Sequence, residues 1–127
     1  MLNNFYFKSV LLAASLMSMP LWATSALAEE KFQRNLMMEH QVQLPSNTVN
    51  AKTIKVTIPA GFKTPDHTHD GPGPRYVVKG KLKVVEGGKE GVYSAGEVFW
   101  ETGGLMSVEN IGKDAAELII FELAPSK

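Results

Sequence analysis

The spacing of glycine and proline constrains the fold of this chain more than any other sequence feature. After about residue 45, turn-forming residues recur at intervals of roughly ten residues, so the stretches between them are short. Few of these stretches carry the 3.6-residue apolar period of a helix. The pattern is typical of an all-β sandwich or barrel and predicts about eight to ten short strands.

Apolar and polar residues alternate in several of these stretches. Segment 49–58, VNAKTIKVTI, places Ile54, Val56 and Ile58 on one face of a predicted strand. The segment 41–44, QVQL, alternates in the same way and predicts a further strand at an edge. Other strands are predicted in YVVKG, KLKVVE, GVYSAGEVFWE and AELIIFEL, with turns at Gly87-Gly88, Ala95-Gly96 and Gly103-Gly104.

The first 28 residues read as an export signal. A short region carrying Lys8 precedes an apolar stretch from Val10 to Ala23, and Ala26-Leu27-Ala28 forms a small-residue cleavage site. The apolar stretch contains Ser15, Ser18 and Pro20, and it is shorter than the roughly 20 residues that a membrane span needs. We therefore predict a signal peptide at 1–28 and one domain at 29–127, located in the periplasm or secreted.

Composition excludes several classes of function. The chain has 13 basic and 13 acidic residues, so its formal net charge of zero argues against nucleic-acid binding and against an attraction to anionic membranes. It has no cysteine, so neither disulfides nor thiolate ligands are available. The sequence also lacks the motifs of nucleophilic hydrolases, phosphate-binding loops and dinucleotide sites.

The clearest candidate for chemistry is the pair His67 and His69. In a strand, residues two apart point to the same face, so both imidazoles can reach one metal ion. A pair of histidines with this spacing is by itself common and is also compatible with a structural role.

The surroundings of this pair resemble the conserved motifs of the cupin superfamily. Gly61, His67-Thr68-His69 and Gly80 match the first motif, and YSAGEVFWETGGLMSVENIG is similar to the second. Together they cover about residues 61–112. The resemblance implies a single-domain antiparallel jelly-roll β-barrel that binds a divalent metal or a small ligand at its mouth.

Two of the four metal ligands that the resemblance implies are missing. The acidic position of the first motif falls on Gly73, and the histidine of the second falls on Met106 or Ser107. With His67 and His69 alone we expect a weakly held ion, which the sequence does not distinguish between iron, manganese, zinc and copper. Met106 either supplies a thioether to copper(I) or fills the barrel interior.

Three further residues are candidates for ligand binding. Arg75 has the same strand parity as Gly73, so it faces the cavity, where it would bind a carboxylate or phosphate or pair with Glu97 or Glu101. Glu101 is also a candidate acid, base or extra ligand, and Trp100 is a candidate for the cavity wall.

The sequence leaves three hypotheses about function. The protein binds a small molecule or a divalent metal through His67 and His69, acts as a metal-dependent enzyme of dioxygenase or isomerase type, or handles copper with the help of Met106. Because fold alone does not choose among them, whether it is an enzyme stays open. The exposed strand predicted near 40–44 also predicts a homodimer formed through strand edges.

Overall fold

The fold was determined from a computed structural model that describes residues 30–44 and 46–126. The predicted signal peptide lies outside the described residues, so export stays a prediction. The β-strands all belong to one compact unit, residues 34–127, whereas residues 30–33 belong to a separate unit. No segment among the residues described forms a helix of the length and apolar character needed to span a bilayer.

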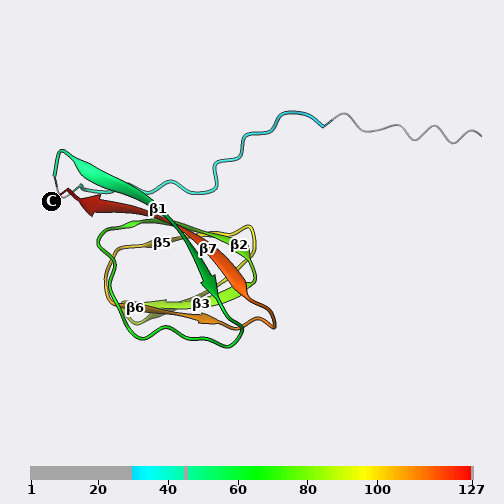
Figure 1. Ribbon diagram of the computed structural model, residues 1–127. Coiled ribbons are helices and arrows are strands. Elements are labelled where there is room, and N and C mark those ends of the chain that lie inside the picture. Colours follow the sequence, from blue (N-terminus) through cyan, green and yellow to red (C-terminus); the bar gives the residue numbers. More distant parts are fainter. Residues whose placement is uncertain (1–29, 45, 127) are drawn as a thin grey trace, which may run out of the picture. The chain divides into compact units, whose positions relative to one another are not determined.

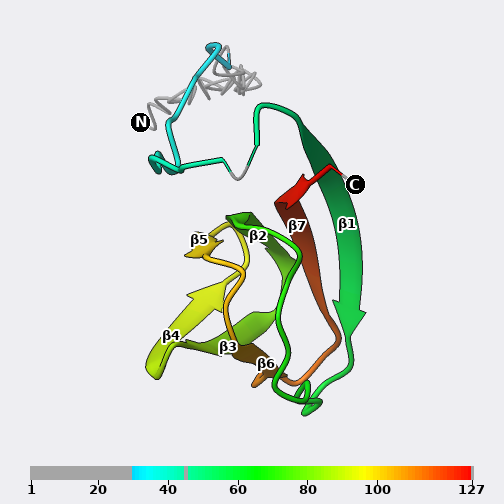
Figure 2. The same cartoon turned by 90° about the vertical axis from the view of Figure 1, so that its left-hand side faces the viewer.

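The described residues form seven strands arranged in two antiparallel sheets that face each other (Figures 1 and 2). The larger sheet has the order β1-β7-β2-β5 and the smaller one β4-β3-β6. The strands are β1 (Val49–Ile58), β2 (Gly73–Lys79), β3 (Lys81–Glu86), β4 (Lys89–Ser94), β5 (Val98–Glu101), β6 (Met106–Asn110) and β7 (Ala116–Pro125).

Most of the predicted strands and turns are confirmed. The strand predicted at 49–58 has those bounds, and Gly87 and Gly88 form the predicted hairpin turn with φ angles of 56° and 76°. Both residues adopt a left-handed backbone, which glycine reaches without steric cost. The all-β class and the antiparallel jelly roll are therefore confirmed.

Two predictions about strands are wrong. The described residues contain seven strands instead of eight to ten, and residues 41–44 form no strand. The alternation in QVQL is not matched by any pairing partner, and a strand forms only where a neighbour takes its backbone hydrogen bonds. The homodimer stays a prediction, but the exposed strand near 40–44 on which it was based is absent.

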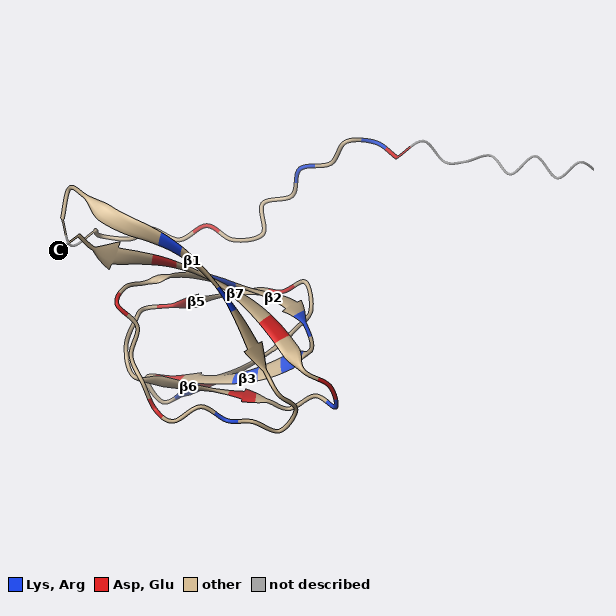
Figure 3. Cartoon of the chain, viewed as in Figure 1, with Lys and Arg blue, Asp and Glu red and all other residues tan. Residues whose placement is uncertain are grey.

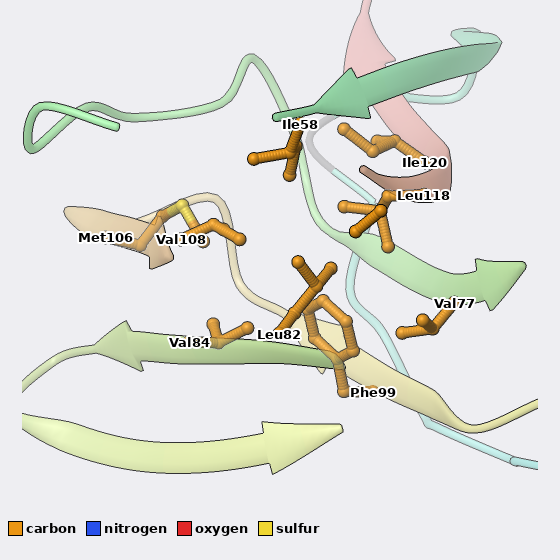
Figure 4. Packing of buried hydrophobic residues seen from close by; sticks show 10 residues of the cluster. Ile58, Val77, Leu82, Val84, Phe99, Met106, Val108, Leu118 and Ile120 are labelled. Carbon is orange, nitrogen blue, oxygen red and sulfur yellow. The ribbon is translucent and has the colours of Figure 1, made fainter. Parts of the chain in front are cut away.

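A single apolar core fills the space between the two sheets (Figure 4). Alternate residues of each strand point inward, as in the burial of Leu82 and Val84 on β3 and of Leu118 and Ile120 on β7. The other members are Ile58, Val77, Phe99, Met106, Val108 and Ala116. With no disulfide in the chain, burial of these side chains is the main source of stability.

The loop between β1 and β2, residues 59–72, places the histidine pair against the smaller sheet. Its backbone forms hydrogen bonds with β6, including Thr64 N to Val108 O at 2.8 Å. His67 and Met106 exchange two such bonds, at 2.9 and 2.8 Å, and form an isolated bridge. The loop thus continues the ladder beyond β6 and spans the side of the fold between the two sheets.

Charged residues of both signs are interspersed along the strands (Figure 3). Three exposed or half-exposed ion pairs involve lysines on β1 and β3, and contributions of this kind are small. The stability of the fold therefore depends on the interior, including the few polar groups buried there.

Asn110 offers a test of this dependence. Its fully buried side chain donates to Ile58 O at 2.9 Å and to Asp114 O at 2.8 Å, and it accepts a bond from Gly112 N. We expect Asn110→Ala to lower the free energy of unfolding by about 2–4 kcal/mol, because it leaves buried backbone groups without partners. Urea denaturation measures this.

The exposed Asn50 provides the matched control, since its amide makes only a 3.5 Å contact with Pro125 O. Asn50→Ala should change stability by less than about 0.5 kcal/mol. Equal effects of the two substitutions would contradict the role given to Asn110.

Candidate functional site

His67 and His69 share one cavity inside the fold. His67 pairs with β6 as an isolated bridge and neither residue lies within a strand, so the predicted strand geometry is replaced by an extended loop. The ring centroids are nevertheless only 5.1 Å apart, in an edge-on arrangement. The cavity has a volume of about 110 Å³ and is lined by Val56, Ile58, Thr64, His67, His69, Glu101, Val108, Leu118 and Ile120.

A backbone carbonyl fixes the tautomer of His67. Its Nδ1 lies 2.8 Å from Pro65 O, and a carbonyl oxygen only accepts hydrogen bonds. Nδ1 therefore carries the proton and donates it. In the neutral imidazole the lone pair is then on Nε2, the nitrogen available to a metal or ligand.

His69 lies between two buried glutamates. Its Nδ1 is 3.2 Å from Glu122 Oε2, within hydrogen-bonding distance, whereas its Nε2 is 3.4 Å from Glu101 Oε2. Both carboxylates are almost completely buried. A carboxylate oxygen only accepts, so the hydrogen bond with Glu122 places a proton on Nδ1, and in the neutral ring the lone pair is then on Nε2, toward Glu101.

Glu101 is also held by a buried cation. Arg75 is 0% exposed, and its Nε donates to Glu101 Oε2 at 2.7 Å. Its Nη1 donates to Phe121 O, while Nη2 is buried with no hydrogen-bond partner in the described part of the chain. Arg75 thus faces inward as predicted, and of its predicted alternatives the structure places it in the ion pair with Glu101.

On the other side of His69, Glu122 connects the cavity to the surface. Its Oε1 lies 3.2 Å from Lys52 Nζ, which in turn lies 2.6 Å from Asp70 Oδ2. Hydrogen bonds to Asp70 and Glu122 raise the pKa of Lys52, so this side chain stays positively charged. Exposure rises along this chain of groups, from 4% for the Glu122 side chain to 38% for Lys52 and 73% for Asp70.

A second hollow lies beside Lys52. It has a volume of about 570 Å³, is more open than the cavity, and is lined by Asn50, Lys52, Asp70, Ala124, Pro125 and Ser126. The His69–Glu122 pair stands next to the cavity, and Lys52, the other partner of Glu122, lines the hollow. One network of charged groups therefore touches both spaces.

Sequence reasoning missed Glu122 and Lys52. Glu122 follows Leu118 and Ile120 on the inward face of β7, which is otherwise apolar. Lys52 is half-buried on the side of β1 that carries Val56 and Ile58. A charged residue in an inward position is costly unless it is paired. This interruption of the alternation is the signal that would have identified them.

Comparison with known proteins identifies the family of this chain. A family model described as a cupin domain matches residues 54–122, more than half of the chain. The chain belongs to the cupin family. A comparison with curated protein sequences found no significant match.

Several solved structures are similar in fold. A Thermotoga maritima protein described as a predicted oxalate decarboxylase has a TM-score of 0.50 at 26% identity, over 57% of this chain and 67% of that one. The cupin domain of Schizosaccharomyces pombe Cnp3 has a TM-score of 0.52 at 21% identity, over 67% and 74%. An RmlC-like cupin from Methanocaldococcus jannaschii has 0.51 at 15% identity, over 71% and 94%.

Gly73, where the resemblance places the acidic residue of the first cupin motif, lies in a tightly packed part of the larger sheet. Gly73 is paired directly with Glu101 across β2 and β5. A Cβ atom at Gly73 would collide with Phe121 O, so the position accepts no side chain. Glu101 therefore brings a carboxylate to the cavity from the strand opposite the empty position.

The other predicted site residues lie elsewhere. Met106, one of the two residues on which the histidine position of the second cupin motif falls, packs in the core and lines a separate hollow of about 180 Å³. Trp100 does not line the histidine cavity, and it stacks on His40 with ring centroids 4.1 Å apart. Asp66 and Asp70 flank the histidines, but the carboxylate that contacts His69 Nδ1 is that of Glu122.

The donors around the cavity fit a metal ion in type. Two imidazole Nε2 atoms and one carboxylate form a set that divalent transition metals accept. Two ligands with bonds of about 2.1 Å at a tetrahedral angle lie about 3.4 Å apart, which is also the separation of His69 Nε2 and Glu101 Oε2. In the described part of the chain, however, no three such side chains already converge on one point, so any ion would be weakly held.

The close approach of β2 and β7 predicts the result of restoring a side chain at position 73. We expect Gly73→Ala to destabilise the fold by about 3 kcal/mol or more, because the added methyl group meets a backbone oxygen that cannot move without separating the strands. Thermal unfolding followed by circular dichroism measures this change.

Gly104 is the control, because it lies in an exposed turn where the nearest atom to an added Cβ is the flexible Thr102 hydroxyl. Gly104→Ala should cost no more than about 1 kcal/mol. If Gly73→Ala is as stable as the native protein, position 73 accepts a side chain and the steric argument is wrong.

Proposed function

We propose that this cupin binds a divalent transition-metal ion at the cavity, through Nε2 of His67 and His69 and the carboxylate of Glu101. The observation that carries the proposal is that both imidazoles have Nδ1 engaged by an acceptor, at 2.8 Å for His67 and 3.2 Å for His69. Metal-binding histidines are commonly held in this way, because the bond at one nitrogen orients the other.

Electrostatics at His69 supports the same proposal. With its proton on Nδ1, the neutral ring directs the lone pair of Nε2 toward Glu101 Oε2, only 3.4 Å away. A lone pair facing a carboxylate is unfavourable in a buried site unless a cation stands between them. A metal ion fills this role, and protonation of the ring is the alternative.

The size of the cavity favours an ion with a small additional ligand. Sites for drug-sized molecules measure about 300–1,000 Å³, whereas this cavity measures about 110 Å³. Its other walls are mainly apolar, from Val56, Ile58 and Leu118 among others. We infer that three protein ligands leave the ion with positions for water or a compact anion of the size of oxalate.

When bound, the ion would act as a Lewis acid toward such an anion. The chain's own groups would hold and orient the site: Pro65 O orients His67, Glu122 orients His69, and Arg75 holds Glu101. Arg75 competes with the metal for Glu101 Oε2, which is a further reason to expect weak binding.

The enzyme and copper alternatives have less support. The similarity to a predicted oxalate decarboxylase suggests oxalate as a probe, but Glu101, the carboxyl group on the cavity wall, is engaged by Arg75 and poorly placed for proton transfer. For copper(I), Met106 lies opposite His67 in the ladder but does not line the cavity.

Metal binding is tested with untagged protein by equilibrium dialysis against zinc or manganese, with the bound ion measured by mass spectrometry. We expect close to one ion per chain. His67→Ala and Glu101→Gln should weaken binding by more than about 100-fold, since even a residue that only supports a ligand is worth about 10–100-fold. Added oxalate should bind to the metal-loaded protein and not to the metal-free protein.

His40→Ala is the control, because this histidine stacks on Trp100 outside the cavity. Binding that His40→Ala removes and His67→Ala does not would overturn the proposed site. Tight copper(I) binding that Met106→Leu weakens would support the copper alternative instead, and oxalate consumption by the loaded protein would support the enzyme.

A further inference from the structure

We infer that Glu122 is a positioning residue that fixes the tautomer and orientation of His69, so that Nε2 is presented to the cavity with its lone pair free. This inference deepens the proposed function and rests on it where metal affinity is concerned. The state of the His69 ring, however, can be measured without any metal.

The geometry around Glu122 supports this role. Its Oε2 accepts a hydrogen bond from His69 Nδ1 at 3.2 Å, and its Oε1 faces Lys52 Nζ at the same distance. The carboxylate is almost fully buried on the inward face of β7. Because both oxygens are engaged in different directions, the carboxylate is fixed in the plane that places one oxygen on the histidine.

Lys52 makes a negative charge at Glu122 tolerable. A buried carboxylate without a cation is strongly disfavoured, and Lys52 supplies the cation from β1, where its side chain is 38% exposed. Asp70 holds the same ammonium group at 2.6 Å. Glu122 therefore has a charge partner of its own, independent of the Arg75–Glu101 pair on the far side of His69.

Two carboxylates compete for the single proton of the neutral His69 ring. Glu122 contacts Nδ1 and Glu101 lies near Nε2, so the proton goes to the nitrogen with the better acceptor. If Glu122 is removed, Glu101 becomes the remaining acceptor and draws the proton to Nε2. That tautomer blocks the nitrogen that faces Glu101.

Nitrogen-15 NMR of the imidazole rings in the metal-free protein, at a pH where they are neutral, reads the tautomer directly. In the native protein we expect His69 to be protonated on Nδ1. In Glu122→Leu we expect the proton on Nε2, together with a zinc affinity lower by about 10–100-fold. His67 should keep its Nδ1 proton in both proteins, because Pro65 O is unchanged.

Two more variants make the experiment decisive. Glu122→Gln changes the shape little, so it should fold even if Glu122→Leu is unstable. Because Lys52 only donates, the amide oxygen should face Lys52 and the amide NH2 should face His69 Nδ1, so we again expect the proton on Nε2. Glu117→Gln is the matched control on the same strand, since Glu117 pairs with Lys55 on the outer face, and it should leave His69 and zinc affinity unchanged.

An Nε2-protonated His69 in the native protein, or an Nδ1-protonated ring in folded Glu122→Leu, would overturn the positioning role. If the tautomer changes in Glu122→Leu but the native protein binds no metal, the positioning role of Glu122 is supported and the proposed metal function is rejected. If the protein binds zinc but the His69 tautomer is the same with and without Glu122, the metal function is supported and the positioning role is rejected.

Discussion

The buried ion pair between Arg75 and Glu101 is the interaction on which the interior of this cupin depends. A guanidinium with no exposed surface is stable only if its charge is balanced nearby, and Glu101 Oε2 does this at 2.7 Å. The pair also decides the direction of the Glu101 carboxylate, which lies on the cavity wall next to His69. A structural requirement, the neutralisation of Arg75, thus places the carboxylate that the candidate site uses.

The same network sets the electrostatic state of the cavity. Glu101 is paired with Arg75 and Glu122 with Lys52, so each buried carboxylate has its own permanent cation. His69 stands between them and can remain neutral without leaving either carboxylate unpaired. In the proposed site, a metal ion would add a positive charge between His69 and Glu101.

Much of the fold could be predicted from the sequence because the signals are local. Alternation over 49–58 and the glycine pair at 87–88 define a strand and a hairpin without reference to the rest of the chain. The strand predicted at 41–44 failed because alternation does not supply a pairing partner. The histidine pair was identified correctly as sharing one face, although a loop docked on β6 produces that arrangement instead of a strand.

Glu101 was named as a candidate ligand from the sequence, but its partners and the role of Glu122 were not, because they depend on register between distant strands. Glu101 lies at the cavity wall because β5 pairs with β2 in the register that sets it opposite Gly73. That glycine is itself imposed by β7, whose carbonyl oxygen at Phe121 occupies the space of a Cβ atom. Because β2 and β7 approach too closely for a side chain at position 73, no carboxylate can be supplied from that position. Glu101, from the strand paired with β2, is a carboxylate that lies beside His69 at the cavity wall.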